Sequence, residues 1–350
     1  MSVRNPVAVL LSNLIQTIGD AHLGRTFKNN VSLDRRGEYE LLQRQTFRGL
    51  LFAEKPEGVH FDQFIRVQVG DLFDKPVVSN QALLETISDL QEYERTSTTP
   101  LYIISGNHDD SKSTTEPTSW DILAEFFRDS PIVYFIKNWT VHSFPDNSQL
   151  LLVGWNIHQS VAQAFIEAED QGYQPNMVVC HLDRISYGND DNVIPYDFLK
   201  SKGVISVVTG HEHKPFHFWE GDMQVIGTGS LLPYSHAEDP EGDFYITIKG
   251  FENVRDYFGT KGAEFFKNKH LRVYIEDEYM DQFLSLQIDS LSLQVNKAEL
   301  MIVDEGVTEV VTESYNAKEI WANATAETGL DKEAATLIWS EIEMKGIESE

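Results

Sequence analysis

The sequence predicts an α/β fold. Short apolar runs rich in β-branched residues recur along the first 250 residues, and amphipathic segments lie between several of them. Apolar runs of this length are typical of buried strands, and their alternation with helices indicates a layered domain. The clearest candidate strands are Leu14–Ile18, Phe64–Val69, Leu101–Ile104, Leu150–Val153, Met177–Cys180 and Val204–Val208.

Three segments between these strands have the spacing of amphipathic helices, namely Arg35–Lys55, Ser79–Glu94 and Ser119–Arg128. Ser79 begins the second segment and Thr118 precedes the third. Serine and threonine accept hydrogen bonds from the free N–H groups of a first helical turn, so both are expected to be helix caps. Two later candidate strands, Gln224–Ile226 and Phe244–Ile248, have no helical segment between them, which predicts an antiparallel part of the sheet.

The pattern changes after about residue 250. The two expected domains are therefore residues 1–250, which hold ten of the eleven histidines, and residues 251–350, a smaller α+β region. The second region has candidate strands at Leu271–Glu276 and Leu291–Val303, around an acidic, helix-like stretch. Two short amphipathic helices are expected to close it, Asn316–Thr325 and Asp331–Lys345.

Composition limits the functional classes. The chain carries 55 acidic against 28 basic residues, a net charge of −27, whereas proteins that bind nucleic acid use Lys and Arg to neutralise phosphates. A single cysteine, Cys180, excludes an internal disulfide and fits the reducing cytosol. No apolar run approaches the roughly 20 residues that span a bilayer. We therefore expect a cytoplasmic protein with no membrane partner.

Five polar clusters each follow a candidate strand. They are GDAHLG (19–24), GDLFD (70–74), GNHDD (106–110), His181 after an apolar run, and GHEH (210–213). A single cluster of this kind usually lies in a turn or at the surface and has no functional role. Five in succession predict one site, because the ends of neighbouring strands collect at one edge of a sheet, where α/β proteins usually bind ligands.

The clusters hold two carboxylates, one amide oxygen and four imidazoles that could bind metal: Asp20, His22, Asp71, Asn107, His181, His211 and His213. Mixed oxygen and nitrogen donors suit Mn²⁺, Fe²⁺ or Zn²⁺ better than Ca²⁺ or Mg²⁺. Seven donors are too many for one ion and fit two ions that share a carboxylate, an arrangement that catalyses phosphoryl displacement. His108 is left over to act as a general acid or charge stabiliser, with Asp109 as its orienting partner.

This series of motifs resembles the calcineurin-like metallophosphoesterases over roughly residues 14–250. The resemblance implies a four-layer α/β/β/α sandwich and two divalent ions, with His108 acting on the leaving group. It implies a first metal on Asp20, His22, Asp71 and His213. It implies a second on Asn107, His181, His211 and again Asp71, the bridge.

Within that superfamily, GDAHLG and GDLFD are similar to the SbcD-type DNA repair and recombination exonucleases, tailed-phage forms included. GTGSLLPYSHAEDPEGDFYI (227–246) resembles a segment of the same nucleases. The resemblance implies a DNA exonuclease or endonuclease, most readily with Mn²⁺, in a bacterial or phage-infected cell. Its implied partners are DNA and an SbcC-type ATPase, and the resembling nucleases act as dimers. Asp74 stands where some members have a histidine.

The charge is unevenly distributed. Residues 1–250 carry 34 acids and 19 bases, whereas residues 251–350 carry 21 and 9. The segment from Arg25 to Lys55 has seven bases against four acids, and its first bases are the expected DNA contacts: Arg25, Lys28, Arg35 and Arg36. Two alternatives remain open, a phosphoesterase acting on a nucleotide or other small phosphoester, and a binding scaffold without chemistry.

Overall fold

The structure is a computed structural model that describes residues 7–10, 13–28, 31–111, 116–156, 159–186, 192–239 and 242–297. The helices expected at Asn316–Thr325 and Asp331–Lys345 lie outside the described residues, as does the end of the strand expected at Leu291–Val303. The described chain forms two compact units. The first comprises the residues up to Thr247 with Glu264–Leu271 and Asp289–Gln294.

Two sheets form the centre of the first unit. The five-stranded sheet has the order β1 (Val7–Leu10), β2 (Asn13–Ile18), β3 (Phe64–Val69), β4 (Leu101–Ile104) and β5 (Val133–Ile136). The six-stranded sheet has the order β10 (Phe216–Glu220), β11 (Met223–Gly227), β9 (Ser206–Thr209), β8 (Met177–Cys180), β7 (Gln149–Val153) and β6 (Trp139–Ser143). The outer strands β1, β10 and β6 are antiparallel to their neighbours, and the remaining strands pair in parallel.

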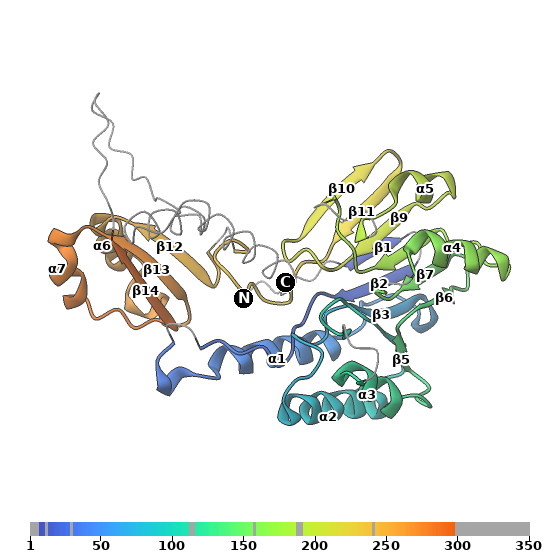
Figure 1. Ribbon diagram of the computed structural model, residues 1–350, viewed down its shortest axis with the longest axis horizontal. Helices are drawn as coiled ribbons and strands as arrows, with labels where there is room; N and C mark the ends of the chain where they lie inside the picture. The colour runs from blue at the N-terminus through green and yellow to red at the C-terminus, as the bar shows by residue number, and fades with distance from the viewer. Residues whose placement is uncertain are drawn as a thin grey trace, which may run out of the picture. The chain divides into compact units, whose positions relative to one another are not determined.

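Helices cover both outer faces of this pair of sheets (Figure 1). Those on the five-stranded sheet are α1 (Glu38–Leu51), α2 (Asn80–Thr96) and α3 (Ser119–Phe126), and those on the six-stranded sheet are α4 (Val161–Asp170) and α5 (Tyr196–Ser201). Ser79 and Thr118 are the expected caps. The Ser79 hydroxyl accepts from the Ala82 N–H, and Thr118 forms a reciprocal capping box with Asp121.

Alternation along the strands explains the layers. In β7, Leu150 and Leu152 pack between the two sheets, whereas Leu151 and Val153 face α4 and α5. Side chains two residues apart point to the same face of a strand, so each sheet needs a partner on both sides. The resulting three cores separate four layers, α/β/β/α, and the predicted fold class is confirmed.

The expected antiparallel part of the sheet is present, although the two late strands do not pair with each other. The first lies within β11. The second overlaps β12 (Tyr245–Lys249), which joins β13 (His270–Ile275) and β14 (Ser292–Lys297) in a separate sheet. The antiparallel strands of the large sheet are instead β10 and β6. Strand polarity here depends on pairings distant in sequence, which local patterns do not specify.

The described part of the second unit comprises Ile248–Ala263, Arg272–Ile288 and residues 295–297. Its helices are α6 (Phe251–Lys261) and α7 (Met280–Ser285), and the Phe251 ring stacks on Tyr279 with centroids 5.3 Å apart. Short 3₁₀ turns lie at Leu33–Arg35, Phe61–Gln63, Ala263–Phe265 and Asp277–Tyr279. The expected division into residues 1–250 and 251–350 stays a prediction. None of the described helices is both long enough and apolar enough to cross a membrane.

A buried histidine in the first unit makes the stability of the folded state depend on pH. His270 is 4% exposed, its ring stacks on Tyr245 with centroids 4.3 Å apart, and burial lowers its pKa to about 4. The unfolded chain, with a pKa of about 6.5, therefore binds this proton more readily. We expect the folded state to lose about 2 kcal/mol at this residue between pH 7.5 and pH 5.

Urea unfolding of the wild type and of His270→Phe at both pH values measures this contribution. The phenylalanine variant, which cannot titrate here, should lose less stability on acidification. An equal loss in both proteins would show that His270 does not contribute.

Candidate metal centre

The site lies where the parallel strands of both sheets end. Asp20 and His22 follow β2, Asp71 follows β3, and Asn107 with His108 follows β4. From the other sheet, His181 follows β8, and His211 and His213 follow β9. The layered packing brings these loops together. The Ala21 and His22 N–H groups both donate to the Asp71 carbonyl oxygen.

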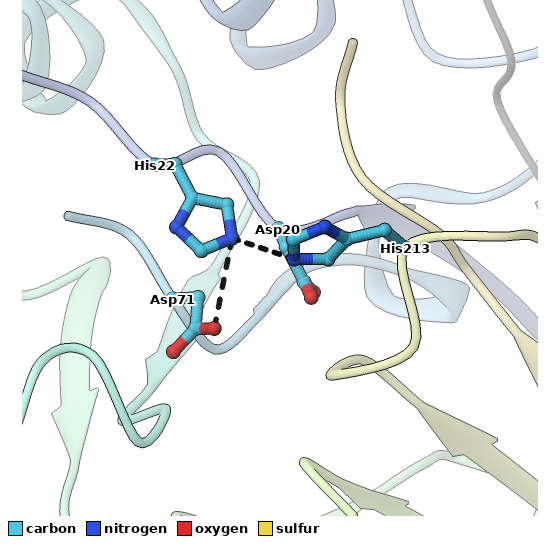
Figure 2. A group of neighbouring side chains, drawn as sticks. All are labelled: Asp20, His22, Asp71 and His213. Carbon is cyan, nitrogen blue, oxygen red and sulfur yellow. Dashed lines mark hydrogen bonds and ion pairs between the residues drawn. The ribbon is translucent and has the colours of Figure 1, made fainter. Parts of the chain in front are cut away.

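One group of donors contains Asp20, His22, Asp71 and His213, whose candidate ligand atoms all lie within 4.8 Å of one another. Figure 2 shows the His22 and His213 rings pointing toward each other, with the Asp71 carboxylate beside them. The Nε2 atoms of the two rings are 3.0 Å apart, and His22 Nε2 is 3.7 Å from Asp71 Oδ2. These are the four residues expected around the first metal.

A second group contains Asp71, His181 and His211, again within 4.8 Å. The Asn107 side-chain oxygen lies 3.0 Å from His181 Nε2 and 2.9 Å from His211 Nδ1. Asp71 belongs to both groups, as a bridging ligand would. The structure therefore brings all seven expected residues together, and their role as metal ligands stays a prediction.

The donors fit divalent cations. Asp20 is fully buried, and its Oδ1 has no hydrogen-bond partner among the described residues. Burial lowers the pKa of His22 well below its usual value, which keeps the imidazole neutral and leaves a lone pair to bind metal. Burial and the charge of Asp71 raise the pKa of Asp20 well above its usual range. A cation between these groups would relieve that repulsion.

Backbone strain is concentrated at the site. Among the described residues, five other than glycine have positive φ, and three of them are His22 (45°), Asp71 (51°) and His211 (76°). Left-handed backbone costs of order 1–3 kcal/mol at such residues and persists only where the surroundings enforce it. The hydrogen bond from the His211 N–H to Asp20 Oδ2, at 2.9 Å, is one such constraint.

Two glycines permit close approach of the loops. A Cβ atom on Gly106 would lie 2.1 Å from Asp71 Oδ1, and one on Gly210 would lie 2.4 Å from the Val69 carbonyl oxygen. Both distances are far inside van der Waals contact, so a larger residue would displace the donors. The glycine in each motif is thus explained by packing against a carboxylate or carbonyl.

Carboxylates on the far side of two histidines were missed from the sequence. His211 Nε2 lies 3.4 Å from Asp183, and His213 Nδ1 lies 3.3 Å from Glu238. His181 instead donates from Nδ1 to the Val69 carbonyl oxygen at 2.8 Å. Such partners set the orientation and tautomer of metal-binding histidines. The spacing of Asp183 from His181 was a weak signal, but Glu238 had no local signal.

These contacts shift the pKa values of His211 and Glu238. Although burial lowers the pKa of His211, hydrogen bonding to Asp183 raises it above its usual value. Burial raises the pKa of Glu238, and the contact with His213 overrides this and lowers it. Each histidine therefore has a carboxylate positioned to hold its distal N–H.

His108 is oriented by a different group from the one expected. Its Nδ1 donates to the Asp74 carbonyl oxygen at 2.7 Å, and its backbone N–H donates to Asp71 Oδ1 at 2.9 Å. Asp109 is buried and accepts hydrogen bonds from the Leu72, Phe73 and Gly106 N–H groups. We therefore correct the expected role of Asp109: it holds the loop together and does not orient the imidazole.

Asp74, where the chain departs from some SbcD-type members, lies inside the site. Its carboxylate is 3.8 Å from His22 Nδ1 and 3.3 Å from Arg25 Nη1. The Arg25 guanidinium also lies over the Tyr234 ring, 4.5 Å from its centroid. Asp74 thus contacts the metal-ligand candidate His22 and Arg25 through its carboxylate, and the His108 imidazole through its carbonyl oxygen.

The proposed DNA-contact residues differ in their surroundings. Arg25 pairs with Asp74, and Arg35 pairs with Glu38 and Asp289. Among the described residues, Lys28 and Arg36 form no ion pair. The local positive charge is thus partly neutralised within the protein, and DNA binding by these four residues stays a prediction.

Comparison with known proteins identifies the family. The model of the calcineurin-like phosphoesterases matches residues 17–215, more than half of the chain. The chain belongs to this family. Its members use divalent metals to hydrolyse phosphoesters, so this chain is a metallophosphoesterase whose candidate ligands all lie in the matched region.

Similar solved structures have low identity to this metallophosphoesterase. The protein TT1561 of Thermus thermophilus is 15% identical, covering 55% of this chain and 85% of that one, with a TM-score of 0.38. Phosphopantetheinyl hydrolase from Mycobacterium tuberculosis is 13% identical, covering 65% and 92%, with a TM-score of 0.37. A putative 5′-nucleotidase from Staphylococcus aureus is 14% identical, covering 62% and 48%, with a TM-score of 0.36.

The close packing at Gly106 predicts that Gly106→Ala lowers metal affinity, because the added methyl group displaces Asp71. We expect Mn²⁺ binding to weaken by about tenfold or more, since misplaced ligands lose affinity much as unsupported ones do. Gly49→Ala in α1 is the matched control, since a Cβ there meets nothing within 4 Å beyond the backbone of its own helix. Titration with Mn²⁺, followed by the electron paramagnetic resonance of the free ion, compares the two. Equal affinities would contradict the role of Gly106.

The contact between Glu238 and His213 predicts a loss of metal affinity in Glu238→Gln. Partners of this kind typically contribute about 10- to 100-fold to affinity. Glu220→Gln is the control, because Glu220 pairs with Lys200 on the surface. Calorimetric titration of both variants with Mn²⁺ measures the effect. Unchanged binding in Glu238→Gln would exclude a role for Glu238 in holding His213.

Proposed function

We propose that this metallophosphoesterase is a two-metal DNA nuclease and acts as the nuclease subunit of an SbcC–SbcD-like complex. The supporting observation is the location of the segment that resembles those nucleases, Gly227–Ile246. The Asp20 N–H donates to the Gly229 carbonyl oxygen at 3.2 Å, and the Leu231 N–H donates to the Asp20 carbonyl oxygen at 2.8 Å. The nuclease-like segment is therefore built onto the first metal motif.

The same segment supports the two histidines of the first group. The Tyr234 ring meets His22 and His213 edge to face, with centroids 5.1 and 5.5 Å apart. The Ser230 N–H donates to the His213 carbonyl oxygen at 3.0 Å. A feature that suggested the nuclease subfamily is thus part of the site, which supports the DNA substrate over a small phosphoester.

The chemistry divides between the ions and the chain. Bound divalent ions activate water and offset the charge on the phosphate. His108 is half-buried beside Asp71, and its Nδ1 is held as a donor by the Asp74 carbonyl oxygen. Nε2 is therefore the atom that can pass a proton to the departing oxygen. The His108 backbone N–H donates a hydrogen bond to Asp71 Oδ1, which fixes the backbone at His108.

The proposal includes Mn²⁺ as the working ion and a cytoplasmic location. Its partners are an SbcC-type ATPase and a second copy of the chain. The net charge of −27 supports dependence on the ATPase, because an acidic protein gains little from phosphate neutralisation. Capture of an ATPase with a Walker A motif, followed by nuclease assays with and without it, tests this part.

His108→Ala should abolish turnover while leaving metal bound. General acid catalysis contributes about 10²- to 10⁴-fold, so cleavage of linear duplex DNA with Mn²⁺ should fall at least a hundredfold. Mn²⁺ affinity should stay close to that of the wild type. His60→Ala is the control, because His60 is an exposed histidine that contacts Asp62. Retained nuclease activity would remove His108 from the mechanism.

Comparing linear duplex DNA with bis-p-nitrophenyl phosphate separates the proposal from its alternatives. Turnover of both substrates supports a nuclease. Hydrolysis of the small diester without DNA cleavage, alone and with the ATPase, would instead favour a small phosphoester substrate. A protein that binds Mn²⁺ and hydrolyses neither would be a scaffold.

A further inference from the structure

A groove of about 580 Å³ opens beside the metal centre. Its wall includes the candidate ligands His211 and His213, and it continues past them to Arg184, Lys214 and Phe216. We propose that this groove binds a backbone phosphate of the DNA strand that is being cleaved. This phosphate is the one next to the cleaved phosphate, and it is bound by Arg184 and Lys214. This inference rests on the proposed nuclease function.

Arg184 is held in place before any ligand binds. Its backbone N–H donates to Glu212 Oε1 at 2.9 Å, and its Nε lies 2.9 Å from Glu212 Oε2. The guanidinium carbon lies over the Phe216 ring, 5.1 Å from the centroid. A fixed, planar guanidinium loses little entropy on binding, and its fork of N–H groups matches a phosphate.

Phe216 is itself fixed, which makes the stack rigid. Its ring lies so close to the backbone of Gly227 that a Cβ atom there would come within 2.3 Å of it. The phenyl ring therefore packs against strand β11, and the Arg184 guanidinium lies over it. The ring serves as a support for the arginine, and we assign it no contact with a base.

The groove retains positive charge for a ligand. The Arg184 side chain is 42% exposed, and its Nη atoms form no hydrogen bond to another described residue. Lys214 is exposed and has no ion pair within the described part of the chain. The two acids in the wall are already engaged, Glu212 with Arg184 and Glu238 with His213.

The geometry distinguishes a polymer from a small substrate. A phosphate at the metals lies next to His211 and His213, and the groove begins at the same two residues. A strand bound there extends its next phosphate into the groove, whereas a diester with a single phosphate reaches only the metals. Arg184 and Lys214 therefore favour nucleic acid over small phosphoesters.

The test compares Arg184→Gln, Lys214→Gln and the double variant on two substrates with Mn²⁺, a single-stranded 20-mer oligodeoxynucleotide and bis-p-nitrophenyl phosphate. For each single variant, we expect the ratio of kcat/KM for the oligonucleotide to that for the diester to fall about tenfold, mainly through KM. Oligonucleotide binding should also become less sensitive to salt. The slope of the logarithm of the binding constant against the logarithm of salt concentration should fall in magnitude by about 0.7 for each contact removed. Lys202→Gln, which removes a lysine paired with Glu169, controls for net charge.

A parallel fall on both substrates would overturn the inference, because it would place these residues in the metal centre. An unchanged ratio would overturn it equally. Because Lys214 is exposed, its variant keeps the test valid even if Arg184→Gln fails to fold. Failure of the proposed function looks different: the wild type itself, with and without the ATPase, would hydrolyse the diester and leave both the oligonucleotide and linear duplex DNA intact.

Discussion

The placement of one carboxylate, Asp71, determines the rest of the site. It is buried at the end of β3, its Oδ2 lies 3.3 Å from His181 Nε2, and it belongs to both groups of candidate ligands. Burial raises its pKa, but the surrounding histidines, His181 first, lower it well below the usual range, so it stays ionised. An ionised carboxylate without water is costly unless cations or hydrogen bonds compensate it. The positive φ of Asp71 and the missing side chain of Gly106 give the carboxylate room in this position, and the imidazoles that face it compensate its charge.

The two-sheet architecture provides the imidazoles. His22 comes from a loop on the five-stranded sheet, and His181 from a loop on the six-stranded sheet. Because the apolar faces of both sheets pack together, the loops at their carboxyl ends lie close to one another. Only some loop residues carry chemistry. Asp109 accepts hydrogen bonds from backbone N–H groups, and Gly106 leaves room for Asp71. Asp183 and Glu238 contact the distal nitrogens of His211 and His213.

Charge explains how an acidic chain can still act on a phosphodiester. Several acids of the first unit lie at the centre, where divalent ions would offset them. Arg184, beside the centre, is held by an acid and a ring, whereas Arg35 is occupied by two acids. Available donors near the metals can therefore bind a phosphate locally, although the net charge of the chain does not favour DNA binding elsewhere.

The sequence by itself determined the fold class, the main strands and the seven candidate ligands. Buried parallel strands are continuous apolar runs, and a polar cluster directly after such a run is visible without coordinates. Segments that local patterns describe poorly were missed. The edge strand β10 and the helix α5 are only five and six residues long, which gives a local pattern little to work with, and the helices expected at the C-terminal end lie outside the described residues.

Only the tertiary structure decided which groups support the ligands. Glu238 lies 25 residues from His213 in the sequence, and the Asp74 carbonyl oxygen that orients His108 has no side-chain signature. The same is true of Arg184, whose position depends on Glu212 and Phe216 from a different loop and strand. Ligand types follow from local chemistry, whereas their orientation depends on contacts between chain segments that only folding brings together.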